Sequence, residues 1–260
     1  MTRTEDLQRI VDALAESRAV LQAIPRERMK IGSKVGGDPV TEVDTAIDAR
    51  LRALLPRAGE GWLSEETADD RARLSARRVW IVDPLDGTRE FVAGIPEWGI
   101  SVALVEDGEA VAGGICNPPL GVTVVGAVGE GLRVEGLLPE GLLSASLRGA
   151  RVLASRSEVA RGEWERFSGA SFHVVPVGSV AWKLALVAAG RADATFTLSP
   201  KNEWDVAAGA ALVRAAGGRV LGLDGRAPRF NQGNTRLPGL LACTSAVEGD
   251  LCALLGIEPR

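Results

Sequence analysis

The sequence predicts an α+β fold, because its two halves are ordered in different ways. The first half begins with two segments of helical periodicity and continues as short apolar strands joined by tight turns. The second half alternates strands with helices, as an α/β layer does. We place the boundary in the glycine-rich stretch 136–149, which divides the chain into residues 1–140 and 141–260.

In the first half, apolar residues recur at helical spacing over 4–24, up to Pro25, and again over 41–55. The stretch from Gly32 to Asp38 between them is expected to be flexible. Four strands should follow, at 79–82, 99–106, 109–116 and 121–128. The dipeptide Asp107-Gly108 favours a hairpin turn between the middle two strands.

In the second half, eight elements are expected in alternation. The strands are 151–154, 172–177, 192–198 and 239–243, and the helices are 157–168, 180–190, 204–216 and 245–255. The third of these helices should end at Gly217-Gly218, since glycine is the usual residue just past a helix.

Composition excludes several classes of protein. With 260 residues, 46% of them hydrophobic and 25% charged, the chain is typical of globular proteins. A net charge of −4 is not the footprint of a protein that binds nucleic acid or an anionic membrane. The basic segment Arg71 to Arg78 is expected to be a solvated face. An anionic substrate would therefore need a local source of positive charge, such as a metal ion.

Cysteine and histidine usage adds two expectations. The three cysteines form no CxxC pair, which favours buried thiols in a reducing compartment. The N-terminus lacks the apolar core of a signal peptide, and no apolar run is long enough to span a bilayer. We therefore expect a cytoplasmic protein. The single histidine, His173, excludes a multi-histidine metal site.

The most informative segment runs from Trp80 to Thr88. A buried strand leads directly into Asp83 and Asp86, and Pro84 turns the chain between them. Two carboxylates held at a strand end form a hard-oxygen site suited to Mg²⁺, and the Leu85 carbonyl is a further candidate ligand. A helix starting at Gly87 and Thr88 would point free amides at a phosphate.

Three other acidic positions complete a candidate metal site. Glu65 follows an apolar segment, Asp205 opens the helix expected from Trp204, and Asp44 ends a Thr-x-x-Asp capping box. Each has an ordinary explanation alone: a solvated loop, a favourable helix dipole, a helix cap. Together with Asp83 and Asp86 they supply the carboxylates that a two-metal phosphoryl-transfer site requires.

These motifs resemble, in the same order, those of the Mg²⁺-dependent, lithium-sensitive phosphatases that include inositol monophosphatases and 3′(2′),5′-bisphosphate nucleotidases. The resemblance implies a layered α/β/α/β/α sandwich, two or three Mg²⁺ ions, and a water oriented and deprotonated by Asp44 and Thr88. The metal ligands that it implies are Glu65, Asp83, the Leu85 carbonyl, Asp86 and Asp205.

Several positions resemble the nucleotidase branch of this family. Arg89-Glu90-Phe91 is close to its Lys-Glu-Phe, and Ser155-Arg156-Ser157 is similar to its Ser/Thr-Arg-Ser run. Lys183 resembles a lysine that nucleotidases place near a nucleotide phosphate, and we expect its ammonium to reach into the cleft. The alternative is a surface lysine whose stem covers apolar neighbours.

Other positions depart from that branch. Gly94-Ile95-Pro96 is closer to the inositol branch, whereas Leu198 stands where that branch carries a glutamate for a ring hydroxyl, unless Glu203 substitutes. Glu158 stands where nucleotidases usually carry a histidine beside the adenine.

The favoured interpretation is a phosphatase whose small phosphorylated substrate is adenosine 3′,5′-bisphosphate, from which it removes the 3′(2′)-phosphate. We expect it to act as a monomer or homodimer. The substrate-binding residues that it implies are Gly87, Thr88, Ser155, Ser157, Ser179 and Lys183. Two alternatives stay open: an inositol- or sugar-phosphate phosphatase, and a non-catalytic interaction protein on the same fold.

Overall fold

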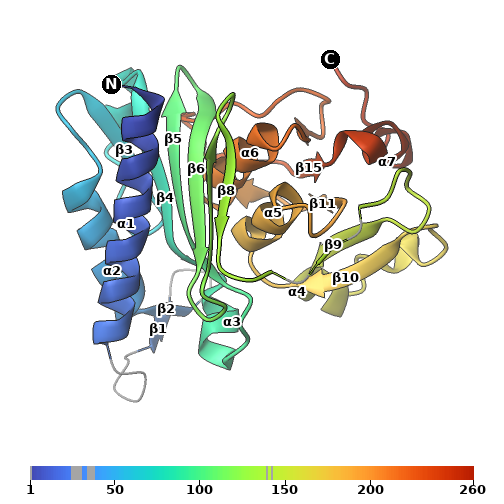
Figure 1. The fold of residues 1–260 in the computed structure, drawn as a ribbon, viewed down its shortest axis with the longest axis horizontal. Helices are drawn as coiled ribbons and strands as arrows, with labels where there is room; N and C mark the ends of the chain where they lie inside the picture. Colours follow the sequence, from blue (N-terminus) through green and yellow to red (C-terminus); the bar gives the residue numbers. More distant parts are fainter. Residues whose placement is uncertain (1, 25–30, 34–38, 139, 142) are drawn as a thin grey trace.

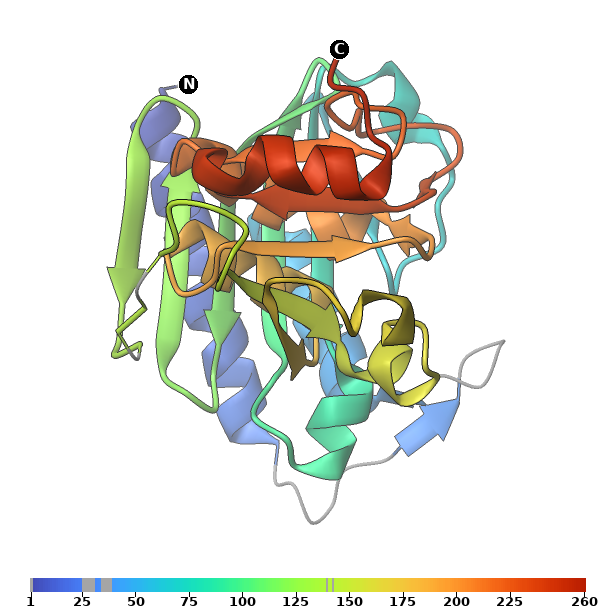
Figure 2. The same cartoon turned by 90° about the vertical axis from the view of Figure 1, so that its right-hand side faces the viewer.

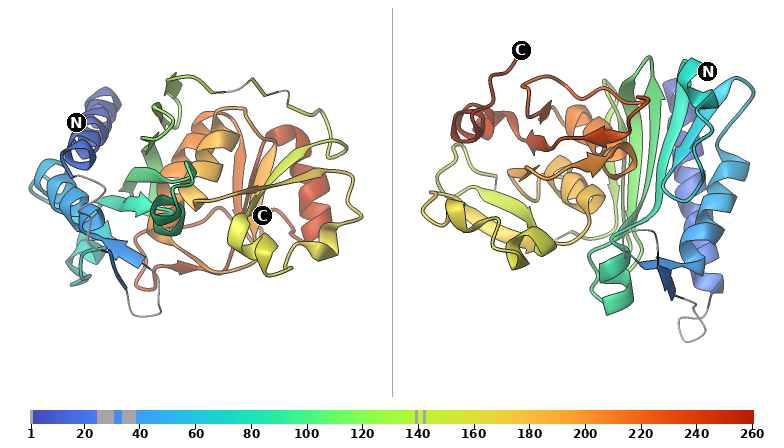
Figure 3. Two further views of the ribbon diagram at one scale, coloured as in Figure 1. Left: turned by 90° about the horizontal axis from the view of Figure 1, so that it is seen from below. Right: turned by 180° about the vertical axis from the view of Figure 1, so that it is seen from behind.

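Five layers of secondary structure are stacked in the computed structural model, which describes residues 2–24, 31–33, 39–138, 140–141 and 143–260 (Figure 1). Two helices cover one face of a six-stranded sheet, two more helices separate it from a five-stranded sheet, and a last helix covers the far side (Figure 3). This α/β/α/β/α sandwich confirms the fold class expected from the sequence.

The first layer consists of α1 (Arg3–Ala23) and α2 (Glu42–Leu54). Thr2 and Thr41 begin these helices with capping boxes that satisfy the first free amides. Both helices were expected. The short strands β1 (Ile31–Ser33) and β2 (Pro39–Thr41) pair between them, whereas Pro25 and most of the stretch expected to be flexible lie outside the described residues.

The six-stranded sheet has the order β3-β4-β5-β6-β7-β8 and is antiparallel except for its first pair. Its strands are β3 (Glu60–Ser64), β4 (Arg78–Asp86), β5 (Gly99–Glu106), β6 (Glu109–Asn117), β7 (Val122–Ala127) and β8 (Gly131–Glu135). Positive φ angles at Asp107 and Gly108 form the expected hairpin turn. The sequence indicated neither β3 nor β8, and β4 continues beyond Val82 to Asp86.

The middle layer is formed by α5 (Val180–Ala188) and α6 (Glu203–Ala215). Gly113 of β6 lets α6 approach the sheet closely, since a Cβ there would lie 2.5 Å from the Ala208 carbonyl oxygen. The apolar residues between the two sheets form one continuous cluster that draws on β5, β6, α5, α6 and the second sheet.

The second sheet has the order β10-β9-β11-β15-β13, and α7 (Glu248–Leu255) lies across its outer face (Figure 2). Its strands are β9 (Arg151–Ser155), β10 (His173–Val177), β11 (Ala194–Thr197), β13 (Arg219–Gly222) and β15 (Leu240–Cys243). Strand β13 was not predicted. The expected helix 157–168 is shorter, since α4 (Arg156–Ala160) ends before Gly162, where φ is positive, and only the 3₁₀ turn η3 (Glu165–Phe167) follows.

Four further short elements are α3 (Thr88–Ala93), the 3₁₀ turn η2 (Ala72–Ser75), and the paired strands β12 (Lys201–Asn202) and β14 (Arg236–Leu237). A further 3₁₀ turn, η4 (Ser245–Val247), precedes α7. In the described part of the chain, no helix combines the length and apolar character that a membrane span requires.

The expectation of a solvated face at Arg71–Arg78 is wrong for two of its arginines. Arg73 is 2% exposed and pairs with Asp69. Arg78 forms ion pairs with carboxylates of three separate elements, which are Asp6, Glu60 and Glu106. The pairings of Arg78 were missed because its partners are distant along the chain.

Candidate active site

A cavity of about 480 Å³ opens where β4 ends, between the six-stranded sheet and the starts of α5 and α6. Every site residue proposed from the sequence lines it except Asp44, which lies behind Thr88. The predicted residues on its walls are Glu65, Asp83, Leu85, Asp86, Gly87, Thr88, Ser155, Ser157, Ser179, Lys183 and Asp205. Elements from both halves of the chain therefore build one site.

Three carboxylates meet in this cavity. The register of β4 against β5 is interrupted between Asp83 and Asp86, so both aspartates occupy an irregular strand end. Asp205 comes from the first turn of α6, where its Oδ2 also accepts the Asn202 amide at 2.8 Å. One oxygen of each of the three residues lies within 4.8 Å of the others.

Burial and mutual repulsion make this cluster unfavourable in its charged form. Burial raises the pKa of Asp83 well above its usual range, and the charges of Glu65 and Asp86 add to the shift. Burial and then the charge of Asp86 raise the pKa of Asp205 to about 8. Three close oxygens that repel one another are a donor set that fits a hard divalent cation such as Mg²⁺.

Glu65 follows β3 directly and lines the same cavity. Its charge raises the pKa of both Asp83 and Asp205, which indicates that it lies close to the cluster. It is not one of the three residues whose oxygens approach most closely.

Asp44 uses its two oxygens for different purposes. Its Oδ2 accepts the Thr41 amide at 2.9 Å and the Thr41 hydroxyl at 2.5 Å, which completes the capping box of α2. Its Oδ1 lies 3.4 Å from the Thr88 hydroxyl, which also lies 3.1 Å from the Leu85 carbonyl oxygen. Capping and a role at the site are therefore compatible.

Two predicted substrate ligands have other partners in the structure. The Ser179 hydroxyl donates to Asp86 at 2.6 Å and accepts the Trp182 amide, so it supports a carboxylate and caps α5. Lys183 lines the cavity, but its ammonium binds the protein itself, and it is not a surface lysine either. It is 4% exposed and its ammonium donates to the carbonyl oxygens of Val177 and Ser179.

The environment of Lys183 also changes its acidity. Burial lowers the pKa of its ammonium to about 8, although the charge of Asp86 opposes that shift. We therefore interpret Lys183 as a support for the 177–179 loop and for Asp86.

The motif Ser155-Arg156-Ser157 joins the two halves of the chain. Arg156 pairs with Glu97 at 2.5 Å, and Glu97 also accepts the Gly178 amide at 2.7 Å. This contact places the hydroxyls of Ser155 and Ser157, which lie 3.0 Å apart, at the cavity wall.

The carboxylates of two glutamates discussed for substrate recognition bind other residues of the chain. Glu158 accepts the Thr197 hydroxyl at 2.6 Å and pairs with Lys201 at 3.1 Å. Glu203 is 1% exposed, and its carboxylate accepts the amides of Asn231 and Gln232. Glu203 therefore does not replace the glutamate missing at Leu198.

Sequence reasoning missed the basic residues of the cavity. Arg161, Lys201 and Arg236, all from the second half of the chain, line it together with Ser199 and Pro200. Lys201 lies four residues before Asp205, a proximity that offered a signal. Arg236 is close only through the pairing of β12 with β14, which no local pattern predicts.

Comparisons with known proteins agree with this geometry. The sequence profile of the inositol monophosphatase family matches residues 5–255. The chain is 34% identical over 217 residues to inositol-1-monophosphatase of Mesorhizobium japonicum, covering 80% of this chain and 81% of that protein. It is 35% identical over 205 residues to 3′-phosphoadenosine 5′-phosphate phosphatase of Mycobacterium leprae, covering 76% and 74%. The crystal structure of CysQ from Bacteroides thetaiotaomicron superposes with a TM-score of 0.76 at 27% identity, covering 92% and 97%.

Proposed function

Since this chain belongs to the inositol monophosphatase family, and is a phosphatase on that ground, we propose that its substrate is adenosine 3′,5′-bisphosphate, from which it removes the 3′(2′)-phosphate. Family membership alone leaves the substrate open, because its similar relatives include both inositol-1-monophosphatase and 3′-phosphoadenosine 5′-phosphate phosphatase.

The observation that carries the proposal is the presence of both charge signs on the cavity walls. The lining includes the clustered Asp83, Asp86 and Asp205, and also the basic residues Arg161, Lys201 and Arg236. Lys201 is paired with Glu158 and Arg161 with Glu163, whereas the Arg236 guanidinium has no ion pair among the described residues. A substrate with one phosphate at the metal site and a second anionic group fits such a cavity better than a monoester does.

We propose that two or three Mg²⁺ ions bind to Glu65, Asp83, the Leu85 carbonyl, Asp86 and Asp205. Bound Mg²⁺ would neutralise the phosphoryl oxygens and make an attacking water more acidic. The oxygen donors of the three clustered aspartates support this assignment. Lithium inhibition is a corollary of the family resemblance.

The remaining residues would orient the reactants. We assign the attacking water to the Thr88 hydroxyl and the Asp44 Oδ1, whose mutual distance of 3.4 Å allows both to contact one water. Asp44 is 1% exposed and anchored through Oδ2, so its Oδ1 is held in place to accept a proton. Gly87 and Thr88 line the cavity where the phosphate would lie, and Ser155 and Ser157 would contact the rest of the substrate.

A panel of phosphate-release assays tests this assignment. The panel compares adenosine 3′,5′-bisphosphate, inositol 1-phosphate and fructose 1,6-bisphosphate. The adenosine bisphosphate should be hydrolysed fastest, and excess chelator should abolish its hydrolysis. Faster turnover of inositol 1-phosphate would support the inositol phosphatase alternative. Release from none of the three, with Mg²⁺ present, would contradict the proposed substrate.

The Arg236→Gln variant tests the second anionic group. Loss of one charge-assisted contact should raise KM for the bisphosphate by about 10-fold and leave that for inositol 1-phosphate unchanged. Arg226→Gln is the matched control, because Arg226 is exposed and does not line the cavity. Equal effects on both substrates would contradict the assignment.

We further propose that the protein acts in a reducing compartment such as the cytoplasm, as a monomer or homodimer. All three of its cysteines, Cys116, Cys243 and Cys252, are buried and unpaired, which supports the first part of this proposal.

A further inference from the structure

The short loop that carries Glu65 is attached to α2 at both ends. The Ser64 hydroxyl donates to the Asp48 Oδ1 at 2.5 Å, and the Thr67 hydroxyl donates to the Asp48 Oδ2 at 2.5 Å. Asp48 is 8% exposed. One buried carboxylate therefore holds the residues on either side of the Glu65-Glu66 pair.

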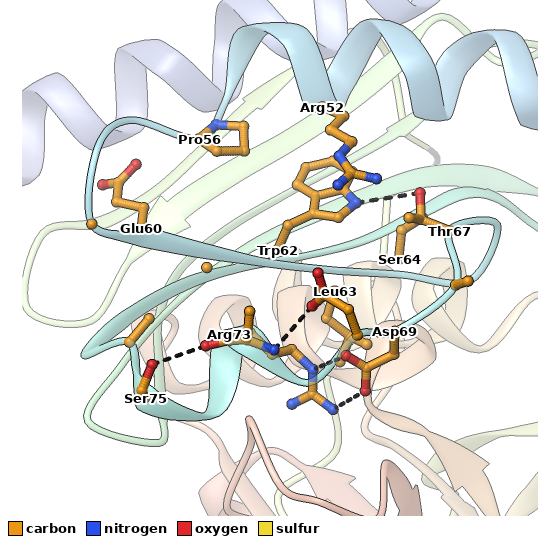
Figure 4. A pocket seen from close by; sticks show the side chains of 16 residues that line it. Arg52, Pro56, Glu60, Trp62, Leu63, Ser64, Thr67, Asp69, Arg73 and Ser75 are labelled. Carbon is orange, nitrogen blue, oxygen red and sulfur yellow. Dashed lines mark hydrogen bonds and ion pairs between the residues drawn. The ribbon is translucent and has the colours of Figure 1, made fainter.

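Both hydroxyls also accept a hydrogen bond, which fixes their orientation. The Ser64 Oγ accepts the Glu66 amide at 3.3 Å, and the Thr67 Oγ1 accepts the Trp62 indole N–H at 3.5 Å (Figure 4). These side chains border a cavity of about 550 Å³ beside β3 that contains none of the clustered aspartates. Glu65 lines the other cavity, so neighbouring residues of this loop border two different cavities.

The pairing of β3 with β4 does not extend to Glu65. The last register partners are Ser64 and Val82, so Glu65 is the first residue beyond the ladder. A glutamate at such a position would lose conformational entropy whenever it engaged a ligand. The two hydrogen bonds to Asp48 reduce that cost by ordering the loop beforehand.

We propose that Asp48 is a positioning residue that holds Glu65 against the acidic cluster. Asp48 lies one helical turn beyond Asp44 on α2, so the same helix positions residues on two sides of the site. This inference rests on the proposed role of Glu65 as a metal ligand. Supporting groups of this kind are typically worth 10- to 100-fold in metal affinity.

The test measures Mn²⁺ binding to the protein without substrate, by electron paramagnetic resonance of the free ion. Asp48→Asn should raise the Kd of the site that includes Glu65 by about 10- to 100-fold, because an amide can accept only one of the two hydroxyl protons. Asp12→Asn, which removes the same charge from an exposed position of α1, is the control and should leave Kd unchanged.

Variants of Thr67 keep the test decisive if Asp48→Asn folds poorly. Thr67→Val removes the hydroxyl at constant size and should weaken Mn²⁺ binding, whereas Thr67→Ser keeps the hydroxyl and should restore it. If Asp48→Asn and Thr67→Val lower Tm but leave Kd unchanged, Asp48 is only structural and the inference is overturned.

Glu65→Gln separates this inference from the function on which it rests. If Asp48 acts through Glu65, adding Asp48→Asn to Glu65→Gln should cause no further loss of affinity. Additive losses would overturn the positioning role while leaving Glu65 a ligand. No effect of Glu65→Gln alone would overturn the proposed metal assignment of Glu65, and the positioning role with it.

Discussion

In the metal-free protein at pH 8, the Asp205→Asn variant should be more stable than the unmodified chain. The pKa of Asp205 rises from 3.8 to about 8, with burial as its main cause. The folded protein therefore keeps this proton over a pH range in which the unfolded chain releases it. The free energy of unfolding of the metal-free protein should accordingly fall as the pH rises from about 4 to about 8.

Each unit of difference between the pKa of Asp205 in the folded and the unfolded chain changes the free energy of unfolding by about 1.4 kcal/mol. The stability gained by the variant is therefore at most about 6 kcal/mol at pH 8 and about 2 kcal/mol at pH 5. Since the neighbouring groups can relax, we expect a gain of about 2–5 kcal/mol at pH 8, or roughly 4–20 °C in Tm. An asparagine keeps an oxygen that can accept the Asn202 amide, so the start of α6 is preserved.

Differential scanning fluorimetry in excess chelator at pH 5 and pH 8 measures this difference. Added Mg²⁺ should raise the Tm of the unmodified protein much more than that of the variant, because ligand binding stabilises the folded state alone. Asp12→Asn is again the control. A variant with the same Tm as the unmodified protein, or a lower one, in chelator at pH 8 would refute this reasoning. That result would mean that burial and repulsion of the carboxylates do not destabilise the metal-free protein.

Three further outcomes are expected. Asp86→Asn should weaken Mg²⁺ binding, measured by calorimetry, and raise the Mg²⁺ concentration needed for phosphate release, because a charged ligand is lost while the Ser179 contact survives. Lys183→Ala should lower kcat/KM for adenosine bisphosphate and inositol 1-phosphate by the same factor, because the Lys183 ammonium binds backbone carbonyls rather than substrate. A fall in kcat/KM for the bisphosphate alone would instead show that Lys183 contacts the second phosphate directly. Glu203→Gln should remove the charged acceptor of one of the two amides, those of Asn231 and Gln232, which costs about 1–3 kcal/mol and lowers Tm by roughly 2–9 °C. An unchanged Tm would contradict the structural role assigned to Glu203.

Elements with strong local patterns were predicted well from the sequence, and those that depend on distant partners were not. Helix α6 matches its expected range to within one residue, since its apolar face and terminal glycines are local signals. Strand β3 has few apolar residues and exists through its parallel pairing with β4, which is separated from it in the chain. Helix α4 is shorter than expected, because the chain turns at Gly162, where φ is positive, and Trp164 then donates to Glu158.

At the site, residue types were predictable and their contacts were not. The acidic motif at Asp83 and Asp86 indicates a metal site from the sequence alone, and the structure places both residues beside Asp205. Lys183 lies within a helix that is otherwise apolar on all sides, a pattern that indicates burial and that our interpretation from the sequence overlooked. The acceptors for its ammonium come from the preceding loop, whose course no spacing rule specifies.

The middle layer of helices has a consequence for synthesis of the chain. The six-stranded sheet is complete once residue 135 is made, yet the helices that cover its inner face end only at Ala188 and Ala215. At about 5–20 residues per second, that face stays bare on the growing chain for roughly 4–16 s. During this interval the apolar surface of β5 and β6 is available to chaperones and to neighbouring nascent chains, and a product terminated before α6 keeps it exposed.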